Sequence, residues 1–191
     1  QKKGASYILN GKKMWITNGT IADVAVIWAK LDEEIRGFLV ETHTPGFRAS
    51  AIQRKFSYRT SPTALIDLNN CEVPQENILP KANGLKSVFQ CLNFARYGVA
   101  SGALGASVCC YQTARDFALK REVFERPIGS YQLVQSQLAR MLVEITKAQL
   151  INHHLGRLLD ANTAIPAQIS LVKLNNVREA LKIAQNARDI L

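Results

Sequence analysis

The hydrophobic pattern of this chain changes its period once, after Asn83-Gly84, and this change constrains the fold more than any other feature. Before it, short runs rich in β-branched residues are separated by turn residues and show no helical spacing. After it, apolar residues recur at steps of three or four up to the last residue, as on one face of a helix. The sequence therefore predicts an α+β chain, with a β domain at residues 1–83 and a helical domain at residues 84–191.

The β domain is expected to contain short antiparallel strands. Asn10-Gly11 accepts the positive φ angles of a two-residue turn, so it predicts a hairpin between residues 6–9 and 12–17. Short strands without helices between them favour a barrel or a sandwich. The other expected strands cover residues 23–29, 36–41, 48–53 and 64–68, and the β region is expected to end with residues 71–74 and 79–80.

Three long helices are expected after Gly84. The first reaches the region of Arg121, and its small residues at 102–106 would let a neighbouring helix approach closely. The second follows a loop in which Ser130 is the candidate N-cap, and the third begins near Pro166. Three antiparallel helices leave one apolar face without a partner, so we expect an incomplete, truncated up-down bundle.

The two ends of the sequence suggest an internal piece of a longer polypeptide. The sequence begins at Gln1 without a Met and stops at Leu191 within a helical pattern. Any targeting peptide would then precede the residues seen here.

The net positive charge of the chain and its distribution limit the kinds of ligand or surface that the chain is expected to bind. The chain carries 24 Lys and Arg against 15 Asp and Glu, a formal net charge of +9. These basic residues are scattered and are not interleaved with aromatic residues, so a nucleic-acid surface is not expected. A few of them could hold a phosphate-bearing ligand, although a solvated basic surface explains the same composition. No apolar run approaches the length that spans a bilayer, so no membrane span is expected.

The cysteines and histidines predict no metal site. No two cysteines have the C-x-x-C spacing, which favours free, buried thiols in a reducing compartment. His153 and His154 are adjacent on a predicted helix and diverge by about 100°, so they cannot easily hold one ion. The remaining residues of these types are Cys71, Cys91, Cys109, Cys110 and His43.

Motifs that carry a reaction by themselves are not found. The sequence has no G-x-S-x-G, no H-E-x-x-H and no Walker loop. Gly102 and Gly105 lie inside a predicted helix, whereas a phosphate loop needs a strand-to-helix turn. Phosphate-loop enzymes are therefore disfavoured.

Two segments are informative about function. Trp15 and Thr17 are two residues apart on a predicted strand, so both side chains would project from one face and could hold a flat heterocycle. A core Trp beside a surface Thr is the simpler interpretation of these two residues alone. The second segment, residues 121–132, offers an Arg, an aromatic ring and an amide at a helix end and loop.

In this order and setting, the segments resemble the acyl-CoA dehydrogenase family of flavoproteins. Residues 14–19 are similar to the flavin-contacting strand of the middle domain, and residues 71–79 to the exit of that domain. Residues 121–132 are similar to the C-terminal segment that reaches the cofactor of a neighbouring subunit. The resemblance covers essentially the whole chain and departs from the family at Glu125, where Gly usually follows the Phe.

Within the family, residues 55–61 and 89–98 look most like the glutaryl-CoA dehydrogenase branch. The resemblance implies oxidation of glutaryl-CoA at Cα–Cβ with FAD as acceptor, and decarboxylation to crotonyl-CoA. It further implies electron delivery to electron-transferring flavoprotein, a role in lysine and tryptophan degradation, and a homotetramer. The expected compartment is the mitochondrial matrix in a eukaryote or the cytoplasm in a bacterium.

The resemblance also implies roles for individual residues. Thr17 would lie near the flavin nitrogen that accepts hydride. The residues implied to line the isoalloxazine are Trp15, Ile16 and Thr17. Those implied to hold the adenine and phosphate side of FAD across a subunit interface are Arg121, Phe124 and Gln132. Those implied to form part of the acyl-CoA site are Phe89, Leu92, Asn93 and Arg96.

The catalytic base of the family is a Glu in a later segment, and no acidic residue here is a credible substitute for it. We therefore expect no catalytic residue in this chain and no turnover by the 191 residues alone. Two alternatives remain open. One is a dehydrogenase of monocarboxylic acyl-CoA that does not decarboxylate. The other is a non-catalytic family member that serves as an interaction module, which only Glu125 favours.

Overall fold

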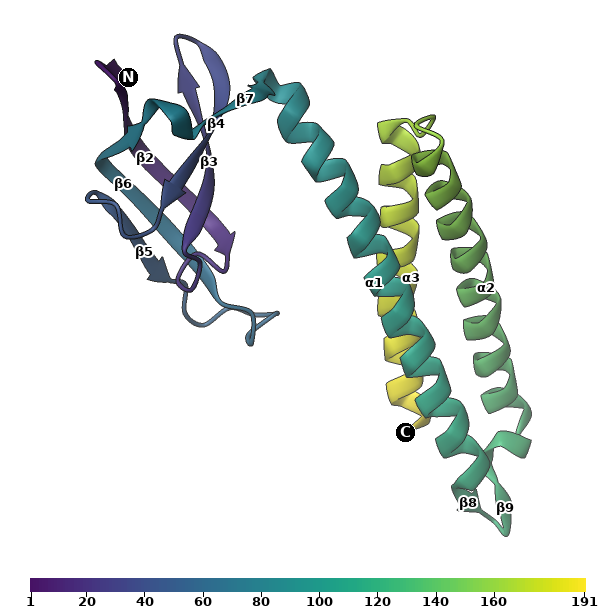
Figure 1. Cartoon of the computed structure of the whole chain (residues 1–191). Coiled ribbons are helices and arrows are strands. Elements are labelled where there is room, and N and C mark those ends of the chain that lie inside the picture. The colour runs from purple at the N-terminus through teal and green to yellow at the C-terminus, as the bar shows by residue number, and fades with distance from the viewer. The chain divides into compact units, whose positions relative to one another are not determined.

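The computed structural model describes residues 1–191 in full. The chain divides into two compact units, Gln1–Phe89 and Gln90–Leu191. The first contains the main strands, and the second contains the long helices (Figure 1). The secondary structure changes at Gly84, where α1 (Gly84–Lys120) begins.

The first unit consists of two antiparallel sheets with a shared core. One sheet has the order β1-β2-β6-β5, with bounds Lys2–Lys3, Ser6–Thr17, Thr63–Pro74 and Phe47–Ala51. The other has the order β3-β4-β7, with bounds Val24–Leu31, Glu34–Glu41 and Ile78–Asn83. A short 3-10 helix, Gln75–Asn77, joins β6 to β7. The sheets do not close into a barrel, so the sandwich is the expectation that is confirmed.

Side chains from both sheets form the core of this unit. The Tyr7 and Phe38 rings meet edge to face with centroids 5.3 Å apart, one from each sheet. The alternation of buried and exposed residues along β2 and β6 gives each strand one inward face. The buried members are Tyr7, Leu9, Ile27, Phe38, Val40, Ile66, Leu68, Cys71 and Val73.

The hairpin predicted at Asn10-Gly11 is wrong. β2 runs through these residues as one strand of 12 residues, and both of its halves pair with β6. Asn10 is held by its side chain, because the Asn70 backbone N–H donates to Asn10 Oδ1 (2.7 Å) and Asn10 Nδ2 donates to Asn70 Oδ1 (3.2 Å). Asn70, with φ of 49°, lies in an irregularity of β6 that faces this part of β2. The signal that resembled a turn therefore belongs to a bulged strand pair.

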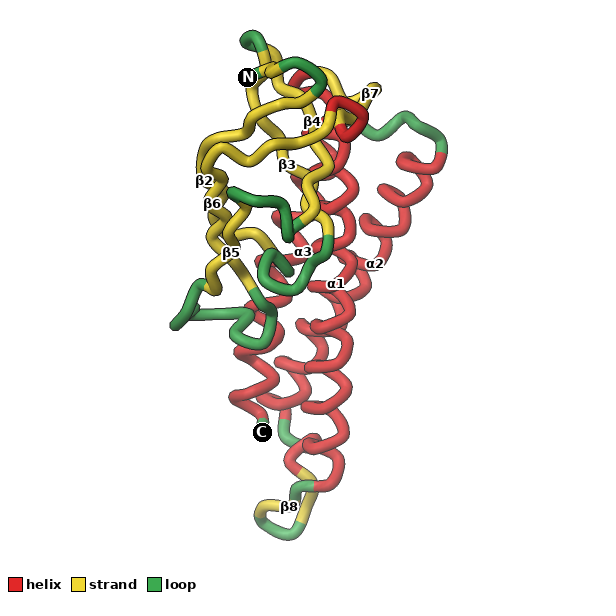
Figure 2. Tube along the Cα trace, turned by 60° about the vertical axis from the view of Figure 1, so that its left-hand side comes forward, coloured by secondary structure: helices red, strands yellow, loops and turns green.

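The second unit is built from three long helices that run side by side (Figure 2). They are α1, α2 (Gln132–Asp160) and α3 (Pro166–Ile190). Between α1 and α2 lie β8 (Glu122–Val123), β9 (Arg126–Pro127) and a 3-10 helix (Ile128–Ser130). None of the helices combines the length and the apolar character needed to cross a membrane.

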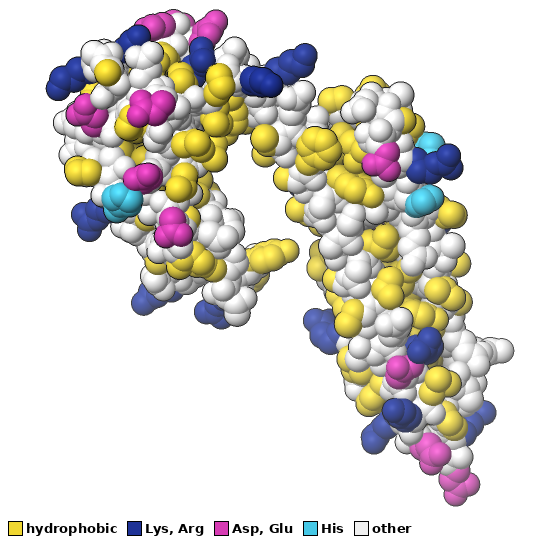
Figure 3. All heavy atoms as spheres, in the orientation of Figure 1, with side chains coloured by type: hydrophobic (Ala, Val, Ile, Leu, Met, Phe, Trp, Pro, Cys, Tyr) yellow, Lys and Arg dark blue, Asp and Glu magenta, His cyan; other side chains and the backbone are white.

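Two apolar clusters hold the helices together, and each takes residues from all three. One cluster contains Ala114, Ala118, Met141, Ile145, Ile183, Ala187 and Ile190. The other contains Ala100, Leu155, Ile169 and Val172. Hydrophobic side chains also remain on the outer surface of this unit (Figure 3), among them exposed leucines of α2 and α3. These observations agree with the expected incomplete bundle.

Two details of the helical unit differ from expectation. Ser130 is not the N-cap of α2, since Tyr131 occupies that position and Ser130 Oγ donates to the Pro127 carbonyl at 2.7 Å. The small residues of α1 do not mark a close helix contact. A Cβ added at Gly102 or Gly105 would meet no atom within 4 Å, so their small size is not required by packing in this chain.

Candidate functional site

The end of β2 contains a β-bulge that displaces Trp15. The register of β2 against β6 shifts between Lys13 and Ile16 by one extra residue on β2. Trp15 has φ of 63°, a left-handed conformation that costs a bulky residue about 1–2 kcal/mol. The alternation that predicted Trp15 and Thr17 on one face does not continue through a bulge. The indole of Trp15 is 60% exposed.

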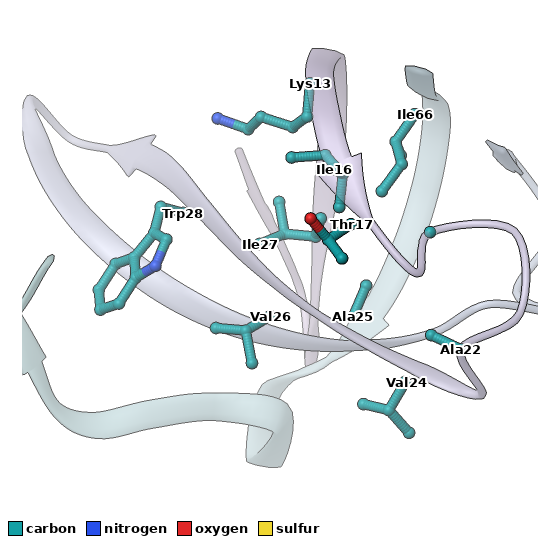
Figure 4. Close-up of a pocket in the computed structure, with 11 residues that line it drawn as sticks. Lys13, Ile16, Thr17, Ala22, Val24, Ala25, Val26, Ile27, Trp28 and Ile66 are labelled. Atoms are coloured by element: carbon teal, nitrogen blue, oxygen red, sulfur yellow. The ribbon is translucent and has the colours of Figure 1, made fainter. Parts of the chain in front are cut away.

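A cavity of about 240 Å³ lies beside this bulge (Figure 4). Ile16 and Thr17 line it, whereas Trp15 does not. Trp28 of β3 supplies the large aromatic ring instead, together with neighbouring apolar residues of the same strand. The full lining is Lys13, Ile16, Thr17, Gly19, Ala22, Val24, Ala25, Val26, Ile27, Trp28 and Ile66.

The chemistry of this lining suits a flat aromatic ligand. Apolar side chains and the Trp28 ring offer contact area, and the polar side-chain groups are the Thr17 hydroxyl, the Lys13 ammonium and the Trp28 indole N–H. Figure 4 shows the Thr17 hydroxyl among the apolar side chains of β2 and β3. This donor set fits an isoalloxazine ring, which is flat, largely apolar and edged with hydrogen-bond acceptors. Lys13 adds a positive charge at the same cavity.

Ile16 and Thr17, which the sequence predicted for the site, line the cavity, and Trp28, which it did not predict, lines it too. Trp28 lies in a run of β-branched residues, so it reads as an ordinary strand residue. Its role depends on the position of β3 relative to β2, which no local pattern reveals.

The predicted nucleotide-binding segment forms a tight hairpin. Glu122 pairs with Pro127 and Val123 with Arg126, which leaves Phe124 and Glu125 as the two turn residues. Their φ angles are 53° and 62°, as a two-residue hairpin turn of positive φ requires.

Glu125 thus adopts the conformation that a glycine would adopt, so its presence does not abolish the turn. The Phe124 side chain is 87% exposed. Arg121 is tied to the far side of the hairpin, because the Ile128 N–H donates to its carbonyl at 2.8 Å. Gln132 is exposed at the first residue of α2. The structure therefore groups Arg121 and Phe124 on one small element, with Gln132 at its exit.

The predicted acyl-CoA residues share one face of α1. Phe89, Leu92, Asn93 and Arg96 are spaced by three, four and seven positions, which places them on adjoining turns. Arg96 Nη1 donates to Asn93 Oδ1 at 3.5 Å, a long bond that joins the two polar members. Phe89 and Leu92 are exposed. This face combines apolar surface with a guanidinium, a donor that suits phosphate.

The thiols differ from the expectation that all four are buried. All are free, but only Cys71 is buried, whereas Cys91 and Cys109 are exposed and Cys110 is partly exposed. Burial raises the pKa of the Cys71 thiol above its ordinary value. No group of three or more His, Cys, Asp or Glu residues is placed to hold a metal ion.

The fold is shared with flavoprotein oxidoreductases of known structure. The chain belongs to the acyl-CoA dehydrogenase family, because residues 1–71 match the family's middle domain and residues 82–191 match its C-terminal domain. FAD is the cofactor of this family.

Individual relatives show which members are similar. The crystal structure of glutaryl-CoA dehydrogenase from Mycobacterium smegmatis is 51% identical, with a TM-score of 0.95 over 99% of this chain and 49% of that one. A crystal structure of a glutaryl-CoA dehydrogenase from the same organism in complex with FADH2 is likewise 51% identical, with a TM-score of 0.95. Glutaryl-CoA dehydrogenase from Desulfococcus multivorans is 35% identical over 79% of this chain and 40% of its own length.

A relative with a different substrate also matches. The short-chain specific acyl-CoA dehydrogenase of Rattus norvegicus mitochondria is 32% identical over 100% of this chain and 48% of its own length. The chain therefore spans less than half the length of each of these relatives.

Proposed function

We propose that this chain forms the middle domain and part of the C-terminal domain of a glutaryl-CoA dehydrogenase. The whole protein would oxidise glutaryl-CoA, release CO₂, and pass electrons to electron-transferring flavoprotein. The observation that carries the proposal is the 51% identity to the Mycobacterium smegmatis glutaryl-CoA dehydrogenase over 99% of the chain. Identity to the rat short-chain enzyme is 32% over a similar span.

The cavity beside β2 is the proposed flavin site. When bound, FAD supplies the oxidant that accepts the two electrons removed from Cα and Cβ of the substrate. Ile16 and Trp28 contribute apolar contact that excludes water from the ring. The Thr17 hydroxyl would be the hydrogen-bond donor to the ring edge, and Lys13 would provide a positive charge at the same cavity.

The β8–β9 hairpin is the proposed contact for the nucleotide part of FAD in a neighbouring subunit. The Arg121 guanidinium matches phosphate oxygens in charge and geometry, and the exposed Phe124 ring offers a surface against which a base can stack. Gln132 adds an amide at the start of α2. A cofactor that contacts two subunits agrees with the proposed homotetramer.

The α1 face is the proposed acyl-CoA contact. Phe89 and Leu92 offer apolar surface for the acyl and pantetheine chain, and Arg96 and Asn93 offer polar groups for its phosphates and carbonyls.

The base that removes the α-proton is proposed to come from outside these 191 residues, so the chain alone would not turn over substrate. The proposed setting is lysine and tryptophan degradation, in the mitochondrial matrix or the bacterial cytoplasm.

The test uses the full-length protein that contains this chain, titrated anaerobically with glutaryl-CoA and, in parallel, with butyryl-CoA. Bleaching of the flavin band by glutaryl-CoA, with CO₂ release on turnover, is the expected result. Bleaching by butyryl-CoA alone would favour the second candidate, a monocarboxylic acyl-CoA dehydrogenase. The match to the rat short-chain enzyme supports this candidate. A protein that binds no flavin would refute both and favour a non-catalytic family member.

A further inference from the structure

Tyr131 contacts both strands of the β8–β9 hairpin. Its ring lies under the guanidinium of Arg126 on β9, with Arg126 Cζ 4.1 Å from the ring centroid. Its hydroxyl donates a hydrogen bond of 2.9 Å to the carbonyl of Val123 on β8. Val123 and Arg126 are register partners and form the last pair before the turn. One side chain therefore holds the pair that closes the turn.

The hairpin needs such a contact. Each of its strands has only two residues, and a short two-stranded hairpin is at best marginally stable in water. Both turn residues, Phe124 and Glu125, have positive φ, a strained conformation for non-glycine residues. The stack and the hydrogen bond of Tyr131 oppose this strain, because opening the turn would break both.

Tyr131 is itself anchored to the rigid part of the unit. It occupies the N-cap position of α2, and its carbonyl accepts a hydrogen bond from the Gln135 N–H at 3.0 Å. The Gln135 side-chain amide also donates to the Gly129 carbonyl at 3.0 Å. The hairpin is thus tied through Tyr131 to the first turn of a 29-residue helix.

We propose that Arg126 and Tyr131 are positioning residues, which hold the hairpin so that Phe124 and Arg121 are preorganised to contact the flavin nucleotide. This inference rests on the proposed function of the hairpin. An exposed aromatic ring on an ordered turn binds with a smaller loss of conformational entropy than one on a mobile loop. Arg126 and Tyr131 need not touch the ligand to act in this way.

The experiment measures FAD affinity on the deflavinated full-length protein, by flavin fluorescence. Tyr131→Phe keeps the ring and loses the hydrogen bond, Arg126→Gln loses the cation, and Tyr131→Ala loses both contacts. We expect Tyr131→Phe and Arg126→Gln each to weaken FAD binding by about threefold, and Tyr131→Ala by about tenfold. Arg126→Lys keeps the charge and should bind within about twofold of the wild type. The matched control is Arg140→Gln, which removes an exposed Arg from the same helical unit.

A second readout follows the hairpin without any ligand. Hydrogen exchange of the Ile128 amide, which donates across the base of the hairpin to Arg121, reports its opening. Exchange should accelerate in Tyr131→Ala and should be unchanged in Arg140→Gln.

The outcomes separate this inference from the proposed function. Unchanged exchange in Tyr131→Ala would overturn the inference, whatever the affinities. Faster exchange with unchanged FAD affinity would show a contact that orders the hairpin but does not position a ligand, and would also overturn it. A wild-type protein that binds no FAD would refute the proposed function and with it the positioning role, while the exchange data would still show whether Tyr131 orders the turn.

Discussion

The side-chain amide of Asn176 on α3 donates a hydrogen bond of 3.3 Å to the backbone carbonyl of Ala100 on α1. The same amide lies 3.4 Å from Asn152 Oδ1 on α2, so Asn176 contacts both other helices. Asn152 Nδ2 in turn donates to Ser101 Oγ at 3.1 Å. Asn176 is only 1% exposed, and a buried polar group that finds its partners in one alignment of three helices fixes their register.

Asn176→Asp should strongly destabilise the helical unit. The substitution replaces an amide donor by a carboxylate oxygen that faces two acceptors, and it buries a negative charge without a cation beside it. The free energy of unfolding should fall by about 3 kcal/mol or more at pH 7. Urea unfolding followed by circular dichroism measures the change. Asn162→Asp makes the same change at an exposed site just after α2, where a carboxylate opposes the helix dipole, and should cost no more than about 1 kcal/mol. Equal losses in the two variants would contradict a role for the buried network.

The helices were predictable because their signal is long and local. The period of three to four persists over the 37 residues of α1, and Pro166 marks the start of α3. The strand pairing was not predictable from the sequence, because it depends on residues far apart along the chain. Asn10-Gly11 carries a strong local turn signal, but the partner that decides its structure is Asn70, 60 positions away.

The residues of the candidate site also differ in how far a local sequence pattern could predict them. Thr17 and Phe124 could be predicted as site residues because short segments around them have a recognisable order of residues. Trp28 was not predicted because it lines the same cavity as Thr17 only through the packing of two sheets. The hairpin at Phe124-Glu125 was not predicted, because a turn of positive φ normally contains Gly or Asn and this one contains neither.

Thr17→Val should weaken FAD binding by the full-length protein. Valine keeps the volume of the side chain and removes the hydroxyl, so one hydrogen bond to the ring edge is lost. The dissociation constant should rise by about three- to tenfold, as the loss of about 1 kcal/mol implies. Thr17→Ser retains the hydroxyl and should stay near the wild type. Equal affinity of the Val variant would remove Thr17 from the flavin site.

Glu125→Gly should stabilise the hairpin. Glycine adopts the φ of 62° found at this position without strain, so the hairpin should gain about 1 kcal/mol. Slower hydrogen exchange of the Ile128 amide is the expected signature. Glu122→Gly makes the same change on β8, where glycine only weakens the strand, and should accelerate exchange. Faster exchange in both variants would show that the Glu125 side chain contributes more than its backbone strain costs.

The four thiols should separate by reactivity. Cys91 and Cys109 are exposed, whereas Cys71 lies in the β core with its pKa raised by burial, so it has less of the reactive thiolate at any pH. Iodoacetamide at pH 8 should alkylate Cys91 and Cys109 first, and Cys71 only after urea unfolds the chain. Peptide mass spectrometry over a time course gives the order. Early modification of Cys71 would mean that the β core opens readily.

Gly46→Ala should be among the most damaging single changes in the β unit. Gly46 has φ of 91°, and a Cβ there would overlap the Asn69 carbonyl oxygen and lie 3.0 Å from the Cys71 backbone. The neighbouring strand β6 cannot easily move away from an added Cβ, because the Asn69 N–H donates a hydrogen bond of 2.9 Å to the Gly46 carbonyl. Strain and clash together should lower the free energy of unfolding by about 2–4 kcal/mol.

The matched control for this change is Gly105→Ala in α1, which should act in the opposite direction. An added Cβ at Gly105 meets no atom within 4 Å, and alanine has the higher helix propensity, so a gain of about 0.5–1 kcal/mol is expected. Urea unfolding under the same conditions measures the change in the free energy of unfolding of each variant, which should be a loss for Gly46→Ala and a gain for Gly105→Ala. A harmless Gly46→Ala would mean that the turn before β5 has another conformation. A damaging Gly105→Ala would mean that this face of α1 is covered by a partner, because only then would the extra methyl group meet an obstacle.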